Sequence, residues 1–449
     1  MPTTKDARAR PVPPGKQRRL AAVALALTVA LSVAAAAGCG GDSSAPSGRV
    51  TLTLWSWVPD LQQQVDMFQT AHPNIKVNLV NAGQGSAEYT KLRTALTAGS
   101  GAPDVAQVEF QLVPSFRVTG DLIDIAKYGA DKLKGDYVDW AWAQVTDGGA
   151  VYAVPWDSGP MGLLYREDIL KQHNIAVPTT WDEFAAAARK LHAADPKVFL
   201  TNFPPNEGGV LTGLAWQAGS RPFQIKDKTS VTVRLDDPAA LKMAQYWGGL
   251  LSEGVVSHEP DFTDEWYQGL NNGRYAAWVT AAWGPVFLSG SAKSTAGKWR
   301  AAPLPQWTAG EKVSANWGGS TLAVIKQTKH PAEAAELAMW LMHDPQVTKL
   351  YTTKQFLFPV LKNLLSSSEF VDQKFDFYGG QPVNQVFGPA ASQVDVSFQW
   401  SPFQDFVYST MNDEVGKAVT GQQSLPDALR AVQRKTTDYA KQQGFTVTG

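Results

Sequence analysis

Two kinds of apolar pattern alternate along most of the chain. Residues 50–55 alternate apolar and polar positions and are rich in β-branched side chains, and residues 75–80 and 103–108 have similar composition, which is typical of strands. Residues 61–71 and 89–98 have apolar positions at helical spacing, and each run ends close to a proline or a glycine. Strands that alternate with helices predict a parallel sheet in a doubly wound α/β lobe.

The same two patterns continue toward the C-terminus. Further strands are predicted at residues 150–155, 162–166, 199–203, 276–280 and 321–325. Further helices are predicted at residues 181–191, 241–251, 332–342 and 403–442, the last with a restart at Ser424. Thr180 can act as a helix cap, and acidic residues follow it in the first turn, so we expect a helix to begin there.

One long apolar run precedes these elements. Basic residues come before residues 20–37, which carry no charge, and small residues then lead to Cys39, the only cysteine of the chain. This order is typical of an export signal. Cys39 resembles the lipobox cysteine of bacterial lipoproteins, with alanine at Ala36 where leucine is usual, which implies acylation with diacylglycerol. A plain secretory signal and an uncleaved anchor are the alternatives, and all three place the remaining chain outside the cytoplasm.

Composition narrows what the exported part can be. Removal of residues 1–38 leaves 411 residues with 34 basic and 40 acidic side chains, a net charge of about −6. This length exceeds one ordinary core, which predicts two lobes. No basic stripe is present in the sequence, so we expect no nucleic-acid partner. The chain has 16 tryptophans, and aromatic planes beyond the needs of a core suit a ligand with flat apolar faces, such as a sugar.

Several short segments occur in an order that resembles a known family. The segments are 54–57, 98–105, 152–157 with 164–166, 178–184, 272–277 with 283–285, and 317–320. In this order they resemble the type 1 extracellular solute-binding proteins of ABC importers, the family that includes the maltose-binding protein. The resemblance runs from about residue 50 to the C-terminus. Three of the segments, near residues 156, 283 and 317, resemble the family's crossings between lobes.

The resemblance implies an α/β, two-lobed periplasmic-binding-protein-like fold of type II, with a mixed sheet flanked by helices in each lobe and crossing segments as the hinge. The expected parts are a signal peptide at 1–38, a lipidated N-terminus and linker at 39–49, lobe 1 at 50–157 plus 284–328, and lobe 2 at 158–283 plus 329–449. The family implies a monomer without a cofactor that holds a sugar, here an oligosaccharide, between its lobes. The partners would be ABC permease subunits with a separate ATPase, and a lipid anchor would hold the protein on the outer face of the cell membrane.

A sugar presents hydroxyls at its rim and C–H groups on its faces, so its site needs carboxylates or amides beside aromatic planes. Ligands of open α/β sheets sit beyond the carboxyl ends of strands. This rule selects Trp57, Gln84, Glu109 and Glu207. The resemblance adds residues of the crossings and of the C-terminal part, which are Trp156, Asp157, Trp283, Trp317, Gly318, Gly319 and Trp400. Several stacked tryptophans would fit more than one sugar ring, bound with roughly micromolar affinity.

Enzyme and metal motifs are missing from the sequence. It has no Gly-x-Ser-x-Gly elbow, and Pro260 directly after His258-Glu259 prevents a His-Glu-x-x-His helix. The six histidines show no metal-ligand spacing, so we expect no catalytic residue and no metal. Two alternatives stay open. One is a secreted glycoside hydrolase with Glu109 and Asp157 as its carboxylates, and the other is the same fold binding a polyamine or a ferric ion.

Overall fold

A computed structural model describes residues 48–449 of the chain. The export segment and Cys39 lie outside the described residues, so the lipid attachment predicted there stays a prediction. Within residues 48–449, no helix combines the length and the apolar character that a membrane crossing requires.

The described residues form a mixed α/β structure. Its strands are β1 (Val50–Trp55), β2 (Ile75–Val80), β3 (Val105–Glu109), β4 (Thr146–Asp147), β5 (Ala150–Val151), β6 (Ala153–Pro155), β7 (Met161–Arg166), β8 (Phe223–Ile225), β9 (Ser230–Val233), β10 (Ala277–Ala281), β11 (Trp299–Pro303), β12 (Ser320–Val324) and β13 (Thr446–Thr448). Its α-helices are α1 (Gln62–Ala71), α2 (Ser86–Ala98), α3 (Val113–Val118), α4 (Asp139–Gln144), α5 (Glu167–Gln172), α6 (Trp181–Ala194), α7 (Gly208–Gln217), α8 (Pro238–Ser252), α9 (Asp264–Asn272), α10 (Gly284–Ser291), α11 (Pro331–His343), α12 (Pro345–Thr353), α13 (Lys362–Leu365), α14 (Ser368–Val371), α15 (Asn384–Ser392), α16 (Gln404–Val419) and α17 (Leu425–Gln442). Short 3-10 helices are η1 (Phe110–Leu112), η2 (Ala126–Tyr128), η3 (Ala130–Asp136), η4 (Lys293–Thr295) and η5 (Asp376–Tyr378).

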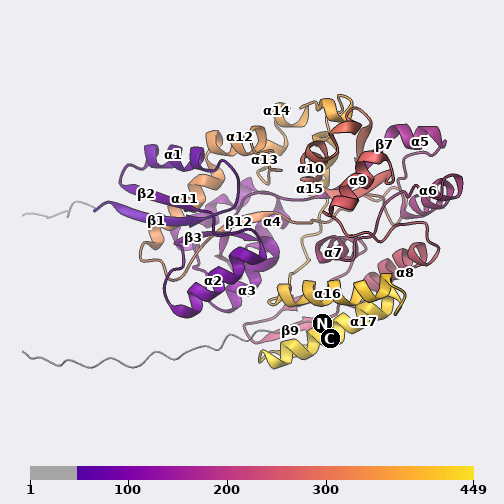
Figure 1. Ribbon diagram of the computed structural model, residues 1–449. Coiled ribbons are helices and arrows are strands. Elements are labelled where there is room, and N and C mark those ends of the chain that lie inside the picture. Colours follow the sequence, from indigo (N-terminus) through magenta and orange to yellow (C-terminus); the bar gives the residue numbers. More distant parts are fainter. Residues whose placement is uncertain (1–47) are drawn as a thin grey trace, which may run out of the picture. The chain divides into compact units, whose positions relative to one another are not determined.

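The first sheet has five strands in the order β2-β1-β3-β12-β6. β1 pairs in parallel with β2 and β3, whereas β12 runs antiparallel to both β3 and β6, so the sheet is mixed. Figure 1 shows α1 and α2 on opposite sides of this sheet. Because β1, β2 and β3 are parallel, their carboxyl ends lie at one edge, where Trp57 and Gln84 follow β1 and β2 and Glu109 ends β3.

The second sheet is built around β7. β10 and β11 pair with β7 on either side, both antiparallel. A smaller sheet has the order β13-β9-β8, and β4 and β5 form a hairpin. The C-terminal helices α16 and α17 pack against each other, and α17 packs on α8; Figure 1 shows this helical layer beside β9.

The chain crosses between the first and second sheets in places that differ in part from the expected ones. β6 leads through Trp156 to β7, as expected, and β11 leads through Trp317 to β12. The expected crossing near Trp283 does not leave the second sheet, because β10 and β11 both pair with β7. The lobe limits stay a prediction. The contacts give a reason to move β11 to lobe 2 and α11 to lobe 1, since α11 packs on β12 and β6.

Local signals at two helix starts are confirmed. The Thr180 side chain accepts a hydrogen bond from the Glu183 N–H, and the Glu183 side chain accepts one from the Thr180 N–H, which completes a capping box for α6. The Ser424 hydroxyl accepts from the N–H of Asp427 at 3.2 Å and caps α17. The helix predicted at 403–442 is therefore two helices with the expected restart.

The prediction of a strand at residues 199–203 is wrong. This segment makes only isolated pairings, at Phe199 with Tyr275 and at Asn202 with Ser257. Because the two partners come from different parts of the chain, no continuous ladder can form, and Pro204 directly afterwards has no N–H to extend one.

Candidate functional site

One wall of the candidate site lies at the carboxyl edge of the first sheet. Glu109 ends β3, and its carboxylate accepts a hydrogen bond from the Tyr89 hydroxyl at 3.1 Å. The Tyr89 hydroxyl in turn accepts from the Glu109 N–H at 3.0 Å. Trp57, which follows β1, meets Tyr89 edge to face with ring centroids 6.0 Å apart. The strand-end rule therefore places Trp57 and Glu109 together, and α2 adds Tyr89, which the sequence did not single out.

Asp157 holds two crossing segments together beside this wall. Its carboxylate accepts a hydrogen bond from the backbone N–H of Ser320, at the start of β12, at 2.7 Å. Burial raises the pKa of Asp157 from 3.8 to about 6. Burial also raises the pKa of Glu109, and the nearby charge of Asp157 adds to that rise, while the hydrogen bond from Tyr89 opposes it.

The connection from β11 to β12 carries Trp317, Gly318 and Gly319 of the predicted site, and Trp283, which lies between β10 and α10, packs against it. The Trp283 indole N–H donates to the Trp317 carbonyl at 2.8 Å, and their rings lie edge to face with centroids 4.6 Å apart. Gly318 and Gly319 both have positive φ, of 82° and 94°. A Cβ on Gly319 would lie 2.8 Å from the Asp157 carbonyl oxygen, so only glycine permits this close backbone approach.

The second wall begins at Glu207, directly before α7. Glu207 is partly buried, and this burial raises its pKa from 4.5 to about 8, helped by the charges of Asp261 and Glu109. The next two residues are glycines because aromatic rings lie against them. A Cβ on Gly208 would come within 2.8 Å of the Tyr408 ring, and one on Gly209 within 2.5 Å of the Trp317 indole nitrogen.

Asp261 and Phe262 join the second wall from the loop before α9. Asp261 is buried and accepts a hydrogen bond from the Asn202 amide at 2.6 Å, and burial raises its pKa from 3.8 to about 7. Phe262 has a φ of 66°, a strained backbone for a bulky side chain. This conformation places its ring 6.2 Å from Trp283 and 6.4 Å from Trp317, by centroids. Sequence reasoning missed both residues, because no local sequence pattern predicts a strained backbone at a phenylalanine.

Tyr408 on α16 lies within electrostatic range of both walls. Burial raises the pKa of its phenol well above the usual range, and the charges of Glu109 and Glu207 raise it further. The helix that carries Tyr408 starts almost 300 residues after Glu109 in the chain, so nothing in the local sequence connects them. We call this set the acid–aromatic cluster; it consists of Trp57, Tyr89, Glu109, Asp157, Glu207, Asp261, Phe262, Trp283, Trp317 and Tyr408.

Five predicted residues lie outside the acid–aromatic cluster: Gly318 and Gly319, which come directly after Trp317, and the three described next. Gln84 is exposed in the loop between β2 and α2. Trp156 is buried against Tyr351, with ring centroids 5.2 Å apart. Trp400 is 2% exposed and packs edge to face on Phe398 at 4.9 Å. Their ligand roles stay predictions, and the burial of the two tryptophans is explained by core packing.

The acid–aromatic cluster has the chemistry that a polyol requires. Burial raises the pKa of Glu207 to about 8 and that of Asp261 to about 7, so near neutral pH these two carboxyl groups can donate as well as accept hydrogen bonds. Aromatic rings stand beside them to cover C–H faces. Within residues 48–449, no three His, Cys, Asp or Glu side chains are placed to hold a metal ion.

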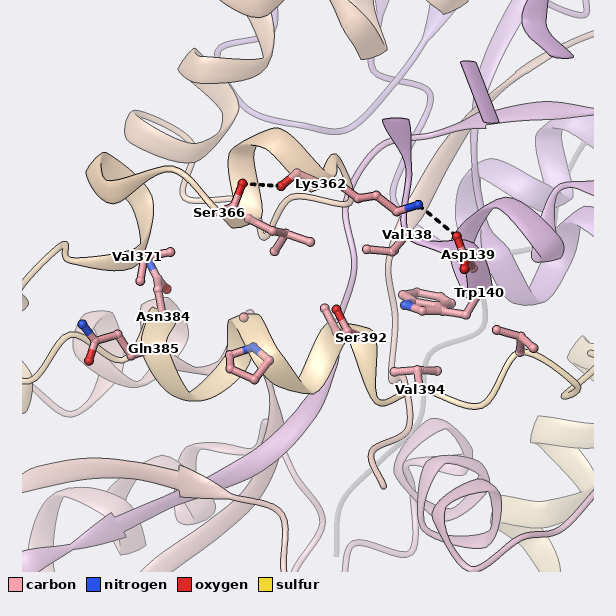
Figure 2. Close-up of a pocket in the computed structure, with 15 residues that line it drawn as sticks. Val138, Asp139, Trp140, Lys362, Ser366, Val371, Asn384, Gln385, Ser392 and Val394 are labelled. Atoms are coloured by element: carbon pink, nitrogen blue, oxygen red, sulfur yellow. Dashed lines mark hydrogen bonds and ion pairs between the residues drawn. The ribbon is translucent and has the colours of Figure 1, made fainter. Parts of the chain in front are cut away.

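A separate cavity of about 520 Å³ lies between α4 and α15 (Figure 2). None of the predicted site residues lines it. We assign the candidate site to the acid–aromatic cluster, because that cluster lies at strand ends and is rich in acids, whereas the cavity walls are mostly apolar.

Comparisons with known proteins agree with the fold. The family model described as "Bacterial extracellular solute-binding protein" matches residues 55–347. A lactose-binding protein of Rhizobium radiobacter is 26% identical over 408 residues, which cover 83% of this chain and 92% of the relative.

Two solved structures are similar over nearly the whole described chain. An ABC transporter associated binding protein from B. animalis subsp. lactis Bl-04, in complex with beta-1,6-galactobiose, is 33% identical, covers 89% of this chain and 99% of its own, and has a TM-score of 0.76. The galacto-N-biose-/lacto-N-biose I-binding protein of Bifidobacterium longum, in complex with lacto-N-biose, is 27% identical, with the same coverage and a TM-score of 0.78.

Proposed function

Because this chain belongs to the bacterial extracellular solute-binding protein family, we propose that it captures a short oligosaccharide in the acid–aromatic cluster and delivers it to the permease of an ABC importer. The fold is the two-lobed α/β fold of sugar-binding proteins of these importers. The observation that carries the proposal is that Glu109, from the first sheet, lies close enough to Glu207 for its charge to raise the Glu207 pKa, while Trp317 packs on Gly209 beside Glu207. A solute bound there would touch both walls, so its binding would favour their closure.

The sugar we propose is a galactose-containing disaccharide or a slightly longer oligosaccharide. The solved neighbour at 33% identity holds beta-1,6-galactobiose, and the matched relative of R. radiobacter is named for lactose. Stacking on Trp283, Trp317 and Phe262 would cover one ring face, and Glu109 and Glu207 would bind its hydroxyls. A cluster of this extent suits two rings better than one.

We propose binding without cleavage. The matched relatives are described as binding proteins. Asp157, one of the two carboxylates that a hydrolase would need, already accepts the Ser320 N–H and holds a crossing in place. Incubation with lactose and beta-1,6-galactobiose followed by chromatography should return both sugars intact, and free galactose would support the hydrolase instead.

Members of this family act outside the cytoplasm, and we propose a lipid anchor at Cys39 for this chain. The sequence around Cys39 supports this proposal. A Cys39→Ala variant should leave the membrane fraction and keep its sugar affinity. A variant that stays with the membrane would show that the apolar run, and not the thiol, anchors the protein.

A thermal-shift screen tests the ligand class. A ligand at 100 times its dissociation constant stabilises the folded state by about 2.7 kcal/mol, which a melting curve resolves easily. We expect lactose or beta-1,6-galactobiose to raise the melting temperature and spermidine or ferric citrate to leave it unchanged. A rise in melting temperature with spermidine and none with any sugar would show that the ligand is a polyamine and not a sugar.

A further inference from the structure

An ion pair joins the two walls of the acid–aromatic cluster. Arg93 lies on α2, between β2 and β3 of the first sheet, and Asp405 lies in the first turn of α16. The Arg93 Nη2 nitrogen is 3.3 Å from the Asp405 Oδ2 oxygen. Figure 1 shows one end of α16 beside α2 and α3. The two partners are 312 residues apart in the chain, so the pair forms only where the walls meet.

Arg93 is fixed to the first wall by contacts within that wall. Its Nη2 nitrogen donates to the Ser115 hydroxyl at 2.9 Å, and its guanidinium carbon lies 4.4 Å from the centre of the Phe116 ring. Ser115 and Phe116 belong to α3, which follows β3 and η1. Tyr89, whose hydroxyl donates to Glu109, lies about one turn earlier in α2 and on the same helix face. Arg93 is therefore an anchored cation on the first wall.

The helix that carries Asp405 belongs to the second wall. α16 packs on α7, and the Tyr408 ring lies against Gly208 at the start of α7. The Asn412 amide donates at 2.9 Å to a carbonyl of the loop before α7. Asp405 lies about one turn before Tyr408, which places both on one helix face. Within residues 48–449, the Asp405 carboxylate has no ion-pair or hydrogen-bond partner besides Arg93.

The pair also balances charge at this corner of the site. Burial is the main cause that raises the pKa of Glu109 and of Tyr408, and the charge of Asp405 adds to both rises. Asp405 is therefore close enough to Glu109 to repel it when both are ionised. Arg93 offsets this repulsion, so α16 can approach the first wall without bringing an unpaired negative charge.

We propose that Arg93 and Asp405 are positioning residues that hold the two walls together around the sugar and slow its release. The inference rests on the proposed function, because it concerns the same site. Neither residue touches the sugar in this role, so breaking the pair leaves each wall intact and lowers only the population of the closed arrangement. The two side chains are 38% and 50% exposed, so the expected effect is modest, about threefold.

The first test measures the release of beta-1,6-galactobiose by stopped flow. Asp405→Asn keeps the size of the side chain and removes its charge, so the dissociation rate should rise about threefold while the association rate changes little. Asp413→Asn is the matched control, because Asp413 is exposed further along the same helix. Equal dissociation rates of the two variants would overturn the proposal.

A double-mutant cycle separates positioning from direct contact. Arg93→Met keeps an apolar chain over Phe116 and removes the charge, so it should release the sugar as fast as Asp405→Asn. In the Arg93→Met background, Asp405→Asn should have no further effect, and the exchanged pair Arg93→Glu with Asp405→Arg should return the rate toward that of the wild type. An effect of Asp405→Asn that persists in Arg93→Met would mean that Asp405 binds the sugar itself. That result, or no recovery in the exchanged pair, would overturn the proposal.

The closure itself is measured without sugar. Spin labels on p-acetylphenylalanine at Ala332 of α11 and Asp438 of α17, both exposed, leave Cys39 unmodified. They report the distance between the walls, because α11 packs on the first sheet and α17 packs on α16. The fraction of molecules at the short distance should be about threefold lower in Asp405→Asn than in Asp413→Asn, and equal fractions would overturn the positioning role. If no sugar binds, the proposed function fails, and this distance measurement still decides whether the pair holds the walls.

Discussion

Two tryptophan-rich regions of the molecule differ in what surrounds them. In the first, Trp181 and Trp247 are each 1% exposed and lie edge to face with centroids 5.6 Å apart, with Phe184 packed on both. In the second, Trp283 and Trp317 also meet edge to face, but Trp283 keeps part of its surface exposed. The first region fills the core between α6 and α8, and the second stands at the meeting of two walls.

The difference teaches that tryptophan content alone does not mark a sugar site. The second region also contains Glu109, Glu207 and Asp261, whose pKa values are all raised by burial. Buried acids are costly to a folded protein, and core packing gives no reason to keep them. Aromatic rings beside buried acids, and not rings alone, distinguish the binding region from the core region.

The largest expected effect separates the two regions by stability. Trp247→Ala removes a fully buried side chain from the core region, so the free energy of unfolding should fall by about 3–5 kcal/mol. The sugar affinity of the molecules that remain folded should not change. Urea unfolding and calorimetric titration below the transition measure the two quantities, and a parallel loss of affinity would make the core region part of the site.

Much of the first wall could be predicted from the sequence, because its residues follow strands. The pattern at residues 50–55 and 103–108 gives the strands, and Trp57 and Glu109 come directly after them. The second wall depends on packing between distant segments. Phe262 reaches it through a strained φ, and Tyr408 through a helix near the C-terminus, and neither feature has a local sequence signal.

Trp400 shows a case in which the resemblance and the packing point to different roles. Family resemblance selects it for stacking on a sugar, yet it packs with Phe398 and Trp216, 4.9 Å and 5.9 Å away by ring centroids. A single sequence cannot separate a core tryptophan from a binding one, since both follow apolar runs. The fold was easier to predict than the site. The alternation of strands and helices repeats along the chain and can be recognised locally, whereas the site brings together residues from distant segments.

The next largest effect is a loss of affinity without a loss of stability. Glu109→Gln keeps the shape of the side chain but replaces one carboxylate oxygen by an amide, so sugar affinity should fall by about 2 kcal/mol, or roughly 30-fold. Glu265→Gln, at an exposed position of α9, is the matched control and should bind like the wild type. Calorimetric titration decides, and equal affinity of the two variants would remove Glu109 from the site.

The buried acids also predict a pH dependence that the core region does not. Burial raises the pKa of Glu207 from 4.5 to about 8. Between these pH values the unfolded chain loses a proton that the folded chain keeps, so the free energy of unfolding decreases as pH rises from 4.5 to 8. Glu207→Gln should be more stable than the wild type by about 1–2 kcal/mol at pH 8 and equally stable at pH 4. The urea midpoints of the wild type and of Glu207→Gln are measured between pH 4 and pH 8. If the difference between the two midpoints does not change with pH, Glu207 is exposed to solvent and the assignment is contradicted.

The smallest effect concerns one stacking ring. Trp283→Phe removes part of an aromatic face and the N–H that donates to the Trp317 carbonyl, so sugar affinity should fall by about 1 kcal/mol, roughly fivefold. Trp340→Phe is the matched control, because Trp340 is also partly buried but packs on Phe68 beside the first sheet. Fluorescence or calorimetric titration that ranks the two variants in the reverse order would contradict the assignment of the second region.

A crystal structure of the protein with beta-1,6-galactobiose tests the central claim most directly. The account predicts the sugar between the two walls, with hydroxyls within hydrogen-bond distance of the Glu109 and Glu207 carboxylates and a ring face against Trp283, Trp317 or Phe262. A sugar bound elsewhere in the molecule, with the acid–aromatic cluster unchanged from its unliganded form, would contradict it.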